Sequence, residues 1–371
     1  MRILIIGTHP NQTNGYARVM NQMITELSKE HKVICYGFNA NMNYLETKYN
    51  KNVIMTAYDD FGIDQISNFV DLCNPDKIII YNDPITVCMF LQEINKIEKT
   101  FQTIVYLDLV YKYIKSKHIE TLNIHADIVI TFLEHWKHEV KRCGYNGKIE
   151  VLPHTCHSSV FKVEKLEARR QLGMPEDGLI LLNLNKNTPR KRYDLFLTGL
   201  SHFFMKNPES KLIVAIGTMR EGAFDLDEFI KIFPNLQGRI DFVANPHNMT
   251  DTTINLMYNA CDIGANVSDG EGFGLCNFEH ACVGAPQIVT ETMSSKEIYR
   301  EGALFVPIKC NYFNDSTRDG IGGMAELIDI DAFVEKLEDI VENFEQYKGK
   351  FENIYTNEHF SETLLKIVNQ S

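Results

Sequence analysis

The chain lacks an excess of positive charge and lacks any long apolar run. Its 371 residues carry a formal net charge of −12. Because nucleic-acid-binding domains normally present a basic face, this charge disfavours a protein that binds nucleic-acid duplexes. No stretch of about eighteen apolar residues occurs, so the sequence predicts no transmembrane helix. The apolar segment that starts at Met1 ends at Gly7, which is too short for a secretory signal.

Cysteine pairs of the C-x2-C type are also missing. The nine cysteines are scattered, and an odd number in a chain of this length favours reduced thiols and a cytoplasmic protein. The P-loop pattern G-x4-G-K-S/T is absent, and the loop after the first apolar segment lacks the dinucleotide pattern G-x-G-x-x-G. These absences disfavour a P-loop protein and a dinucleotide-dependent dehydrogenase.

Short apolar runs alternate with helical patterns through the whole chain. In the first half such runs occupy residues 2–7, 33–37, 53–56, 77–81, 103–107 and 128–131. Runs of about four to six apolar residues suit strands covered on both faces, as in a parallel sheet between helices. A second set occupies residues 179–184, 211–216, 240–243, 263–266, 287–290 and 303–306. The sequence therefore predicts two doubly wound α/β domains in tandem.

We place the first Rossmann-like domain at residues 1–155 and the second at residues 156–350, followed by an amphipathic C-terminal segment at residues 351–371. Open parallel sheets bind ligands outside the carboxyl ends of their strands, so tandem domains predict a cleft between them. Residues 315–323 are polar and glycine-rich, and we expect a surface loop there.

The most informative segment is residues 268–279, where a glycine-rich turn enters an expected helix. Glu271 lies in the turn and Glu279 lies in the first turns of the helix. Backbone N–H groups at such a turn bind anions, and the helix dipole adds about half a positive charge. An anion site between two carboxylates suits a nucleotide-diphosphate sugar, whose hydroxyl groups need acceptors on either side of the diphosphate.

A second segment carries the positive charge that a diphosphate needs. Lys186, Arg190, Lys191 and Arg192 follow one expected strand and precede a helix, which places them at the carboxyl edge of the second sheet. Cations at such a turn bind a diphosphate and stabilise it as it departs.

These segments resemble the E-x7-E motif and its companions in retaining glycosyltransferases of family 4, which have the GT-B fold. The resemblance runs in order from Met1 to about Phe360. It implies an N-terminal acceptor domain, a C-terminal donor domain, a connection at residues 149–154 and a last helix that packs back on the first domain. It also implies metal-independent transfer of a hexose, with retention, from GDP-mannose or a UDP-hexose to a hydroxyl of a glycan or glycoconjugate, without a cofactor.

The resemblance also assigns roles to individual residues. It implies that Glu279 binds the ribose hydroxyls and that Glu271 lies near the transferred sugar. The diphosphate and the sugar would be held by Lys186, Lys191 and the backbone of Gly272, Phe273, Gly274 and Leu275. Arg190 or Arg192 would compensate for the lysine at position 186.

The chain departs from the family pattern at three places. Lys186 stands where an Arg is usual. A planar guanidinium group, which can donate two parallel hydrogen bonds, is thereby replaced by an ammonium group that acts as a point charge. Asp108 stands at or beside the place of a His that contacts the donor sugar. Asn14 precedes Gly15 where many members have two glycines, and Asn tolerates the left-handed conformation better than most residues. The Asp108 departure resembles a subgroup of these glycosyltransferases that is encoded by large DNA viruses.

Two other readings remain open at this point. The Lys186 and Asp108 departures suit a non-catalytic nucleotide-sugar-binding subunit of a glycosylation assembly. A different enzyme with the same fold, such as an epimerase or a phosphorylase, is disfavoured by the E-x7-E pattern and by the lack of a lysine motif for pyridoxal phosphate. The sequence favours GDP-mannose as donor on resemblance alone, and it leaves open a homodimer.

Overall fold

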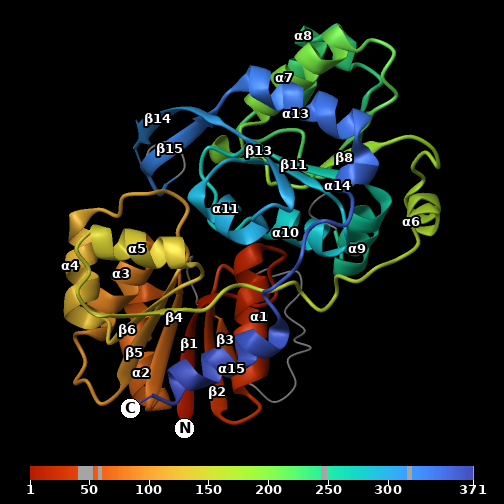
Figure 1. The fold of residues 1–371 in the computed structure, drawn as a ribbon. Coiled ribbons are helices and arrows are strands. Elements are labelled where there is room, and N and C mark those ends of the chain that lie inside the picture. The colour runs from red at the N-terminus through yellow and green to blue at the C-terminus, as the bar shows by residue number, and fades with distance from the viewer. Residues whose placement is uncertain (41–52, 57–60, 244–248, 316–319, 371) are drawn as a thin grey trace. The chain divides into compact units, whose positions relative to one another are not determined.

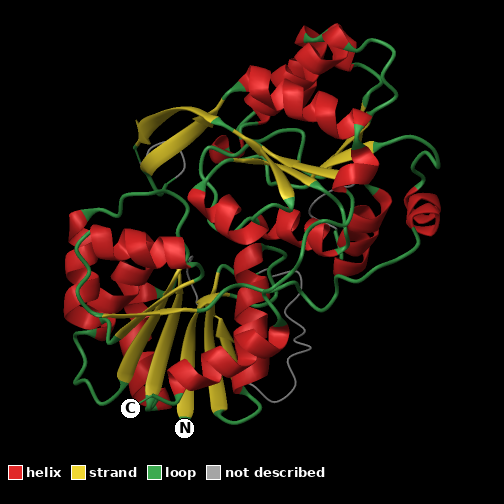
Figure 2. Ribbon diagram, in the orientation of Figure 1, coloured by secondary structure: helices red, strands yellow, loops and turns green. Residues whose placement is uncertain are grey.

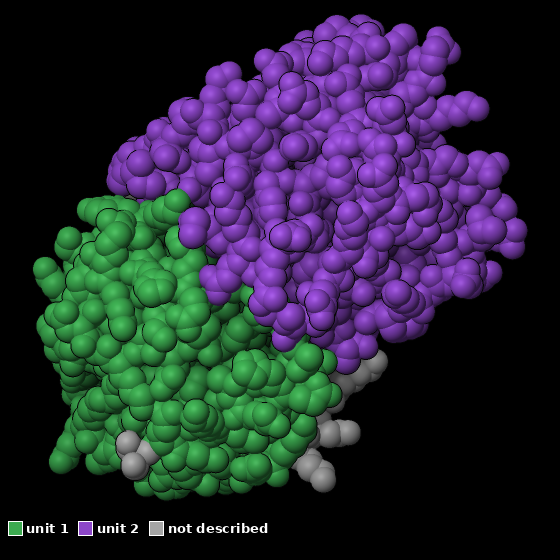
Figure 3. All heavy atoms as spheres, in the orientation of Figure 1, with its two compact units in different colours: residues 1–155, 355–371 green, residues 156–354 purple. Residues whose placement is uncertain are grey.

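The computed structural model describes residues 1–40, 53–56, 61–243, 249–315 and 320–370 (Figure 1). Helices and strands alternate along nearly the whole chain (Figure 2). The chain divides into two compact units (Figure 3), which are Met1–Thr155 with Tyr355–Ser371 and Cys156–Ile354. Among the described residues no helix has the length and apolar character that crossing a membrane requires.

The first unit contains a seven-stranded sheet in the order β3-β2-β1-β4-β5-β6-β7, with every neighbouring pair parallel. The strands are β1 (Arg2–Thr8), β2 (Lys32–Phe38), β3 (Val53–Thr56), β4 (Lys77–Asn82), β5 (Gln102–Leu107), β6 (Ile128–Thr131) and β7 (Lys148–Val151). Strand β7 was not predicted, because residues 149–154 were read as a connection between domains. It is an edge strand whose charged residues alternate with apolar ones, so its pattern lacks a continuous apolar run.

Helices cover this sheet on both faces. They are α1 (Gly15–Leu27), the short 3-10 turn η2 (Ile63–Gln65), α2 (Ile66–Cys73), α3 (Pro84–Ile94), α4 (Ser116–His125), α5 (Glu134–Arg142) and α15 (Asn357–Val368). The C-terminal α15 packs beside α1, where Ser361 donates a hydrogen bond to Glu26 (Figure 1).

Helix α3 begins earlier than its apolar pattern indicates, since that pattern favours a helix near residues 90–99. The side chain of Asp83 accepts hydrogen bonds from the backbone N–H groups of Ile85 and Thr86, at 2.8 and 3.0 Å. Pro84 occupies the first helical position, where its missing N–H has no consequence. The capping residue therefore decides where this helix starts.

The second unit contains a six-stranded parallel sheet in the order β10-β9-β8-β11-β12-β13. Its strands are β8 (Ile180–Asn183), β9 (Ile213–Ile216), β10 (Ile240–Phe242), β11 (Ile263–Asn266), β12 (Gln287–Thr290) and β13 (Ala303–Val306). Its helices and 3-10 turns are α6 (Lys165–Leu172), η3 (Pro189–Lys191), α7 (Tyr193–Lys206), α8 (Leu226–Ile232), η4 (Pro234–Leu236), α9 (Asp251–Ala260), α10 (Leu275–Cys282), α11 (Met293–Tyr299), α13 (Ile330–Glu342) and α14 (Phe344–Tyr347).

Both faces of this second sheet are buried, as the continuous apolar runs predict. Leu181 packs in a cluster with the aromatic side chains of α7 and with Phe333 of α13. Its neighbour Leu182 points to the opposite face, where it packs with Met257 and Tyr258 of α9. Because successive strand residues alternate between faces, each run supplies two hydrophobic cores. The two doubly wound parallel sheets confirm the predicted α/β class.

One element of the second unit was not predicted. The strands β14 (Ile308–Asn314) and β15 (Gly323–Ile328) form an antiparallel two-stranded sheet apart from the six-stranded one (Figure 2). The polar loop that we expected at residues 315–323 extends into β15, which begins at Gly323, and residues 316–319 lie outside the described residues. Strand β14 mixes exposed, half-buried and buried positions, and β15 is buried or half-buried throughout, so neither shows a clean alternating pattern.

Candidate functional site

The glycine-rich turn lies between β11 and α10, at the carboxyl edge of the second sheet. Gly274 immediately precedes α10 and adopts the left-handed conformation, with φ 74° and ψ 52°. A Cβ added there would lie 3.2 Å from the Cγ atom of Glu271. Glycine therefore allows the turn to close tightly over Glu271 before the helix begins. The positive end of the α10 dipole lies next to this turn.

The basic turn reaches the same place because β8 and β11 are neighbouring parallel strands. The turn leaves β8, forms η3 and enters α7 through Arg192, whose φ of 49° is left-handed. The backbone N–H of Asp269 donates a 2.9 Å hydrogen bond to the carbonyl of Arg190. Two segments that are remote in sequence are thus joined directly at the sheet edge.

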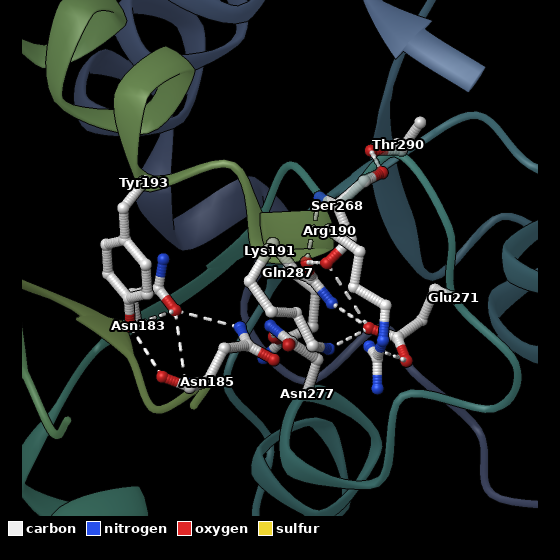
Figure 4. A network of polar contacts seen from close by, with 11 residues as sticks. Asn183, Asn185, Arg190, Lys191, Tyr193, Ser268, Glu271, Asn277, Gln287 and Thr290 are labelled. Atoms are coloured by element: carbon white, nitrogen blue, oxygen red, sulfur yellow. Dashed lines mark hydrogen bonds and ion pairs between the residues drawn. The ribbon is translucent and has the colours of Figure 1, made fainter. Parts of the chain in front are cut away.

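Lys191 and Glu271 form an ion pair at the centre of this junction (Figure 4). The Nζ of Lys191 contacts the Oε2 of Glu271, and a guanidinium nitrogen of Arg190 lies 4.0 Å from the Oε1. Lys191 is only 8% exposed. Burial raises the pKa of Glu271, but Lys191 and Arg190 outweigh burial and lower that pKa from 4.5 to about 2. Glu271 is therefore ionised at neutral pH, and two cations surround it.

The other two cations of the basic turn are placed differently. The guanidinium of Arg192 donates to both carboxylate oxygens of Asp194, at 2.9 and 2.8 Å, and lies 3.3 Å from Asp269. Arg192 thus stabilises the turn. Lys186 is exposed and lies outside the ion pair. The structure brings Lys191, Arg190 and Glu271 together, and it leaves the predicted role of Lys186 at a diphosphate as a prediction.

Glu279 lies on α10 and is 2% exposed. The hydroxyl of Tyr258, from α9, donates a 2.9 Å hydrogen bond to one of its carboxylate oxygens. A buried carboxylate held in this way is an oriented acceptor. Its predicted contact with ribose hydroxyls stays a prediction.

A small pocket, partly open to solvent, lies against the glycine-rich turn. Glu271 and the backbone of Gly272, Phe273 and Gly274 form one side of it. The rest is lined mainly by hydroxyl and amide side chains, including Asn266, Ser268, Asn277, Thr290, Ser294 and Tyr299. Such a lining offers hydrogen bonds to a ligand that is rich in hydroxyl groups. The described residues hold no cluster of three or more His, Cys, Asp or Glu that could bind a metal ion.

The remaining predicted site residues belong to the first unit. Asp108 follows β5 and accepts a 3.2 Å hydrogen bond from the hydroxyl of Tyr81. Asn14 caps α1 by accepting a 3.0 Å hydrogen bond from the N–H of Ala17. Its backbone is extended, with φ −134°, so the tolerance of Asn for the left-handed conformation is not used at this position. The helix start at Gly15 needs a side-chain acceptor there, which a second glycine would not supply.

Sequence reasoning missed two residues that organise the site. Asn266 ends β11 and donates a 2.8 Å hydrogen bond to the carboxylate of Glu271. Asp269 accepts a 2.5 Å hydrogen bond from Tyr312 of β14, and its carbonyl accepts one from Glu326 of β15. Asn266 could have been noticed as the polar residue that ends an apolar run at the ligand edge of the sheet. Nothing local in the sequence indicates the partners of Asp269.

No protein-family model matches the chain. Over 146 residues it is 29% identical to the D-inositol 3-phosphate glycosyltransferase of Stackebrandtia nassauensis, a match that covers 38% of this chain and 33% of that protein. Over 168 residues it is 26% identical to the D-inositol 3-phosphate glycosyltransferase of Thermobispora bispora, covering 44% of this chain and 38% of that protein. The chain thus spans about a third of the length of the curated relatives it matches.

Solved structures match the chain over its full length. The sucrose-phosphate synthase of Thermosynechococcus elongatus has a TM-score of 0.73 at 15% identity, covering 100% of this chain and 95% of that chain. The Alr3699/HepE protein of Anabaena, in complex with UDP-glucose, has a TM-score of 0.75 at 13% identity, covering 99% of both chains. At these identities the likeness shows the fold alone. The fold is of the GT-B type with two Rossmann-like domains, as the sequence predicted.

Proposed function

We propose that this chain is a glycosyltransferase that moves a hexose from a nucleotide-diphosphate sugar to a hydroxyl of a glycan or glycoconjugate. The observation that carries the proposal is the convergence of Lys191 and Arg190 on Glu271, beside the N-terminal end of α10. Cations, a helix N-terminus and glycine backbone together make a site for a diphosphate. The partial identity to D-inositol 3-phosphate glycosyltransferases supports the same activity.

The chemistry of this proposal is charge compensation. As the glycosidic bond breaks, the sugar acquires oxocarbenium-like positive charge and the departing diphosphate becomes more negative. Lys191, Arg190 and the α10 N-terminus would stabilise the departing charge in a partly dry site. We propose that the acceptor oxygen bonds to the anomeric carbon on the face from which the diphosphate leaves. The leaving phosphate takes the acceptor proton, and the anomeric configuration is retained.

Two classes of donor fit the proposed activity. We favour GDP-mannose on the family resemblance, and a UDP-hexose is supported by the shared fold with a protein solved in complex with UDP-glucose. Because two protein cations and a helix end would compensate the diphosphate, we propose that transfer requires no divalent metal.

A calorimetric screen of nucleotide sugars tests the proposal, with and without EDTA. We expect one donor, GDP-mannose or a UDP-hexose, to bind with the same affinity in both conditions. NMR of the transfer product then reports the anomeric configuration. A chain that binds no nucleotide sugar would refute the proposal, and binding that disappears with EDTA would refute metal independence.

The alternative is a chain that binds the donor without transferring its sugar. Asp108, where similar proteins often carry a His, is the observation that favours this alternative. Donor hydrolysis or transfer by the purified chain separates the two, since a binding subunit would release neither sugar nor nucleotide diphosphate from a tightly bound donor.

A further inference from the structure

Glu271 is the anion beside the ammonium group of Lys191, the same group that the proposed function assigns to the diphosphate. The two side chains are in direct contact, and Arg190 lies near the second carboxylate oxygen (Figure 4). Lys191 is only 8% exposed, and Glu271 is the carboxylate that its ammonium group contacts. A carboxylate and a diphosphate both need this cation. Both are anions, so bringing them to the same ammonium group also makes them repel each other.

Asn266 gives Glu271 a second partner that carries no charge. The Oδ1 of Asn266 accepts hydrogen bonds from the backbone N–H of Ser268, at 3.0 Å, and from the hydroxyl of Ser268. The amide oxygen therefore faces Ser268, and the Nδ2 must face Glu271, to which it donates at 2.8 Å. Asn266 is 5% exposed, so this orientation is held by its surroundings. Glu271 can remain in place if Lys191 turns away.

We propose that Lys191 exchanges partners: it pairs with Glu271 when the site is empty and with the donor diphosphate when the site is filled. Asn266 acts as a positioning residue that keeps Glu271 in place after the exchange. The inference rests on the proposed function, because it takes the diphosphate as the competing anion. It implies that Glu271 weakens the binding of the nucleotide diphosphate product and so helps to release it.

The variant Glu271→Gln shows whether Glu271 competes with the diphosphate for Lys191 or helps Lys191 to bind the diphosphate. The glutamine keeps the length of the side chain and can still accept the hydrogen bond from Asn266, but it cannot hold Lys191 by charge. If Glu271 competes with the diphosphate, the variant binds UDP and GDP more tightly, by about tenfold or more, which corresponds to about 1.4 kcal/mol. If Glu271 instead orients Lys191 toward the diphosphate, the variant binds both nucleotides more weakly.

The measurement is calorimetric titration of the full chain with UDP and with GDP at low salt. Glu291→Gln is the matched control, because it removes a carboxylate that follows β12 and pairs with Lys296 rather than with Lys191. Its affinity should stay within about twofold of wild type. Glu271→Asp shortens the side chain while keeping its charge, and it serves if circular dichroism shows that Glu271→Gln is unfolded. It should tighten binding to a smaller degree.

The outcomes are distinct. Wild-type chain that binds neither nucleotide overturns the proposed function. Wild-type chain that binds one of them, with Glu271 variants that bind it equally or more weakly, overturns the exchange and leaves the proposed function standing. Tighter binding by the Glu271 variants, together with an unchanged Glu291→Gln control, supports the exchange.

Asn266→Ala tests the positioning role through a pH profile. Loss of the amide donor removes a hydrogen bond to the charged form of Glu271, so the pKa of Glu271 rises in the donor complex. The acid limb of kcat should move to higher pH by about one unit, while nucleotide affinity at pH 7 stays close to wild type. A variant that loses thermal stability but keeps the wild-type acid limb would show that Asn266 is structural only.

Discussion

Lys191 differs from the other lysine on its turn in its surroundings. Its charge is enclosed beside Glu271, whereas Lys186 is exposed to water. Water and salt screen an exposed charge much more strongly than a buried one. The sequence pattern does not distinguish the two lysines. In the folded chain the charge of Lys191 is screened less than the charge of Lys186 and therefore acts more strongly on a neighbouring group.

Lys191→Ala should therefore impair transfer more than Lys186→Ala. Removing one preorganised charge that stabilises the departing diphosphate should raise the activation free energy by about 2 to 4 kcal/mol. For the exposed Lys186 we expect about 1 kcal/mol or less. Steady-state kinetics with the best donor measures both as changes in kcat, and equal losses in the two variants would contradict the ranking.

The ionised state of Glu271 has a consequence for stability at acidic pH. Its pKa is lowered from 4.5 to about 2 in the folded chain, so the folded state binds fewer protons than the unfolded state between these values. The stabilisation of the folded state that ionised Glu271 contributes is complete above pH 4.5 and is lost as pH falls toward 2. By linkage this stabilisation amounts to at most about 3 to 4 kcal/mol.

We expect Glu271→Gln to lack this acid sensitivity. Urea unfolding of the wild type and the variant, measured from pH 3 to pH 7, gives the difference in their free energies of unfolding. That difference should be constant above about pH 5 and should change in favour of the variant as pH decreases. A difference that does not vary with pH would mean that Glu271 has an ordinary pKa.

Among the elements, the β14–β15 hairpin is tied to the glycine-rich turn through Asp269. Asp269 bonds to both strands through Tyr312 and Glu326, and its backbone N–H bonds to the basic turn at Arg190. Arg192 adds a charged contact to the same carboxylate. Three segments of the second unit thus meet at one buried carboxylate, so the hairpin supports the turn that carries Glu271.

Tyr312→Phe should loosen this junction. The change removes one hydrogen bond to a charged group, which is worth about 1.5 to 3 kcal/mol. Hydrogen exchange should become faster in residues 268–274 and in both strands of the hairpin. Phe313→Leu is the neighbouring control, since Phe313 is 57% exposed and should leave exchange in the turn unchanged. If exchange becomes faster only in the hairpin, the hairpin does not stabilise the turn.

At the scale of the whole molecule, the chain crosses from one unit to the other and returns. Residues 156–354 build the second unit, and the segment from Tyr355 to the C-terminus belongs to the first. Phe360 and Leu364 of α15 are fully buried within it. The last helix therefore contributes to the core of a domain whose strands all lie between Arg2 and Val151.

Phe360→Ala should destabilise the first unit. Removing a fully buried phenylalanine leaves a cavity and lowers the free energy of unfolding by about 3 to 5 kcal/mol. Thermal unfolding measures the loss, and hydrogen exchange should show α1 and α15 losing protection together. Glu362→Ala, at an exposed position of the same helix, should change stability by less than about 0.5 kcal/mol. Independent loss of protection in α15 alone would mean that it is only loosely docked.

Some features of this protein follow from local sequence. The apolar runs determine the strands because burial on both faces requires continuous hydrophobicity, and every predicted strand from residues 2–7 to residues 303–306 is present in the structure. The glycine-rich turn before α10 is also a local signal, since Gly274 must adopt a left-handed conformation.

Other features depend on which segments become neighbours, and only the tertiary structure decides them. The order of strands places β8 beside β11, and this pairing brings Lys191 rather than Lys186 against Glu271. The contacts of Asn266 and Asp269 arise in the same way. Local patterns report whether a residue is buried, but they do not report its partner. The sequence alone therefore determined two parallel sheets and a turn suited to an anion, and the packing of loops at the sheet edge decided which charges meet there.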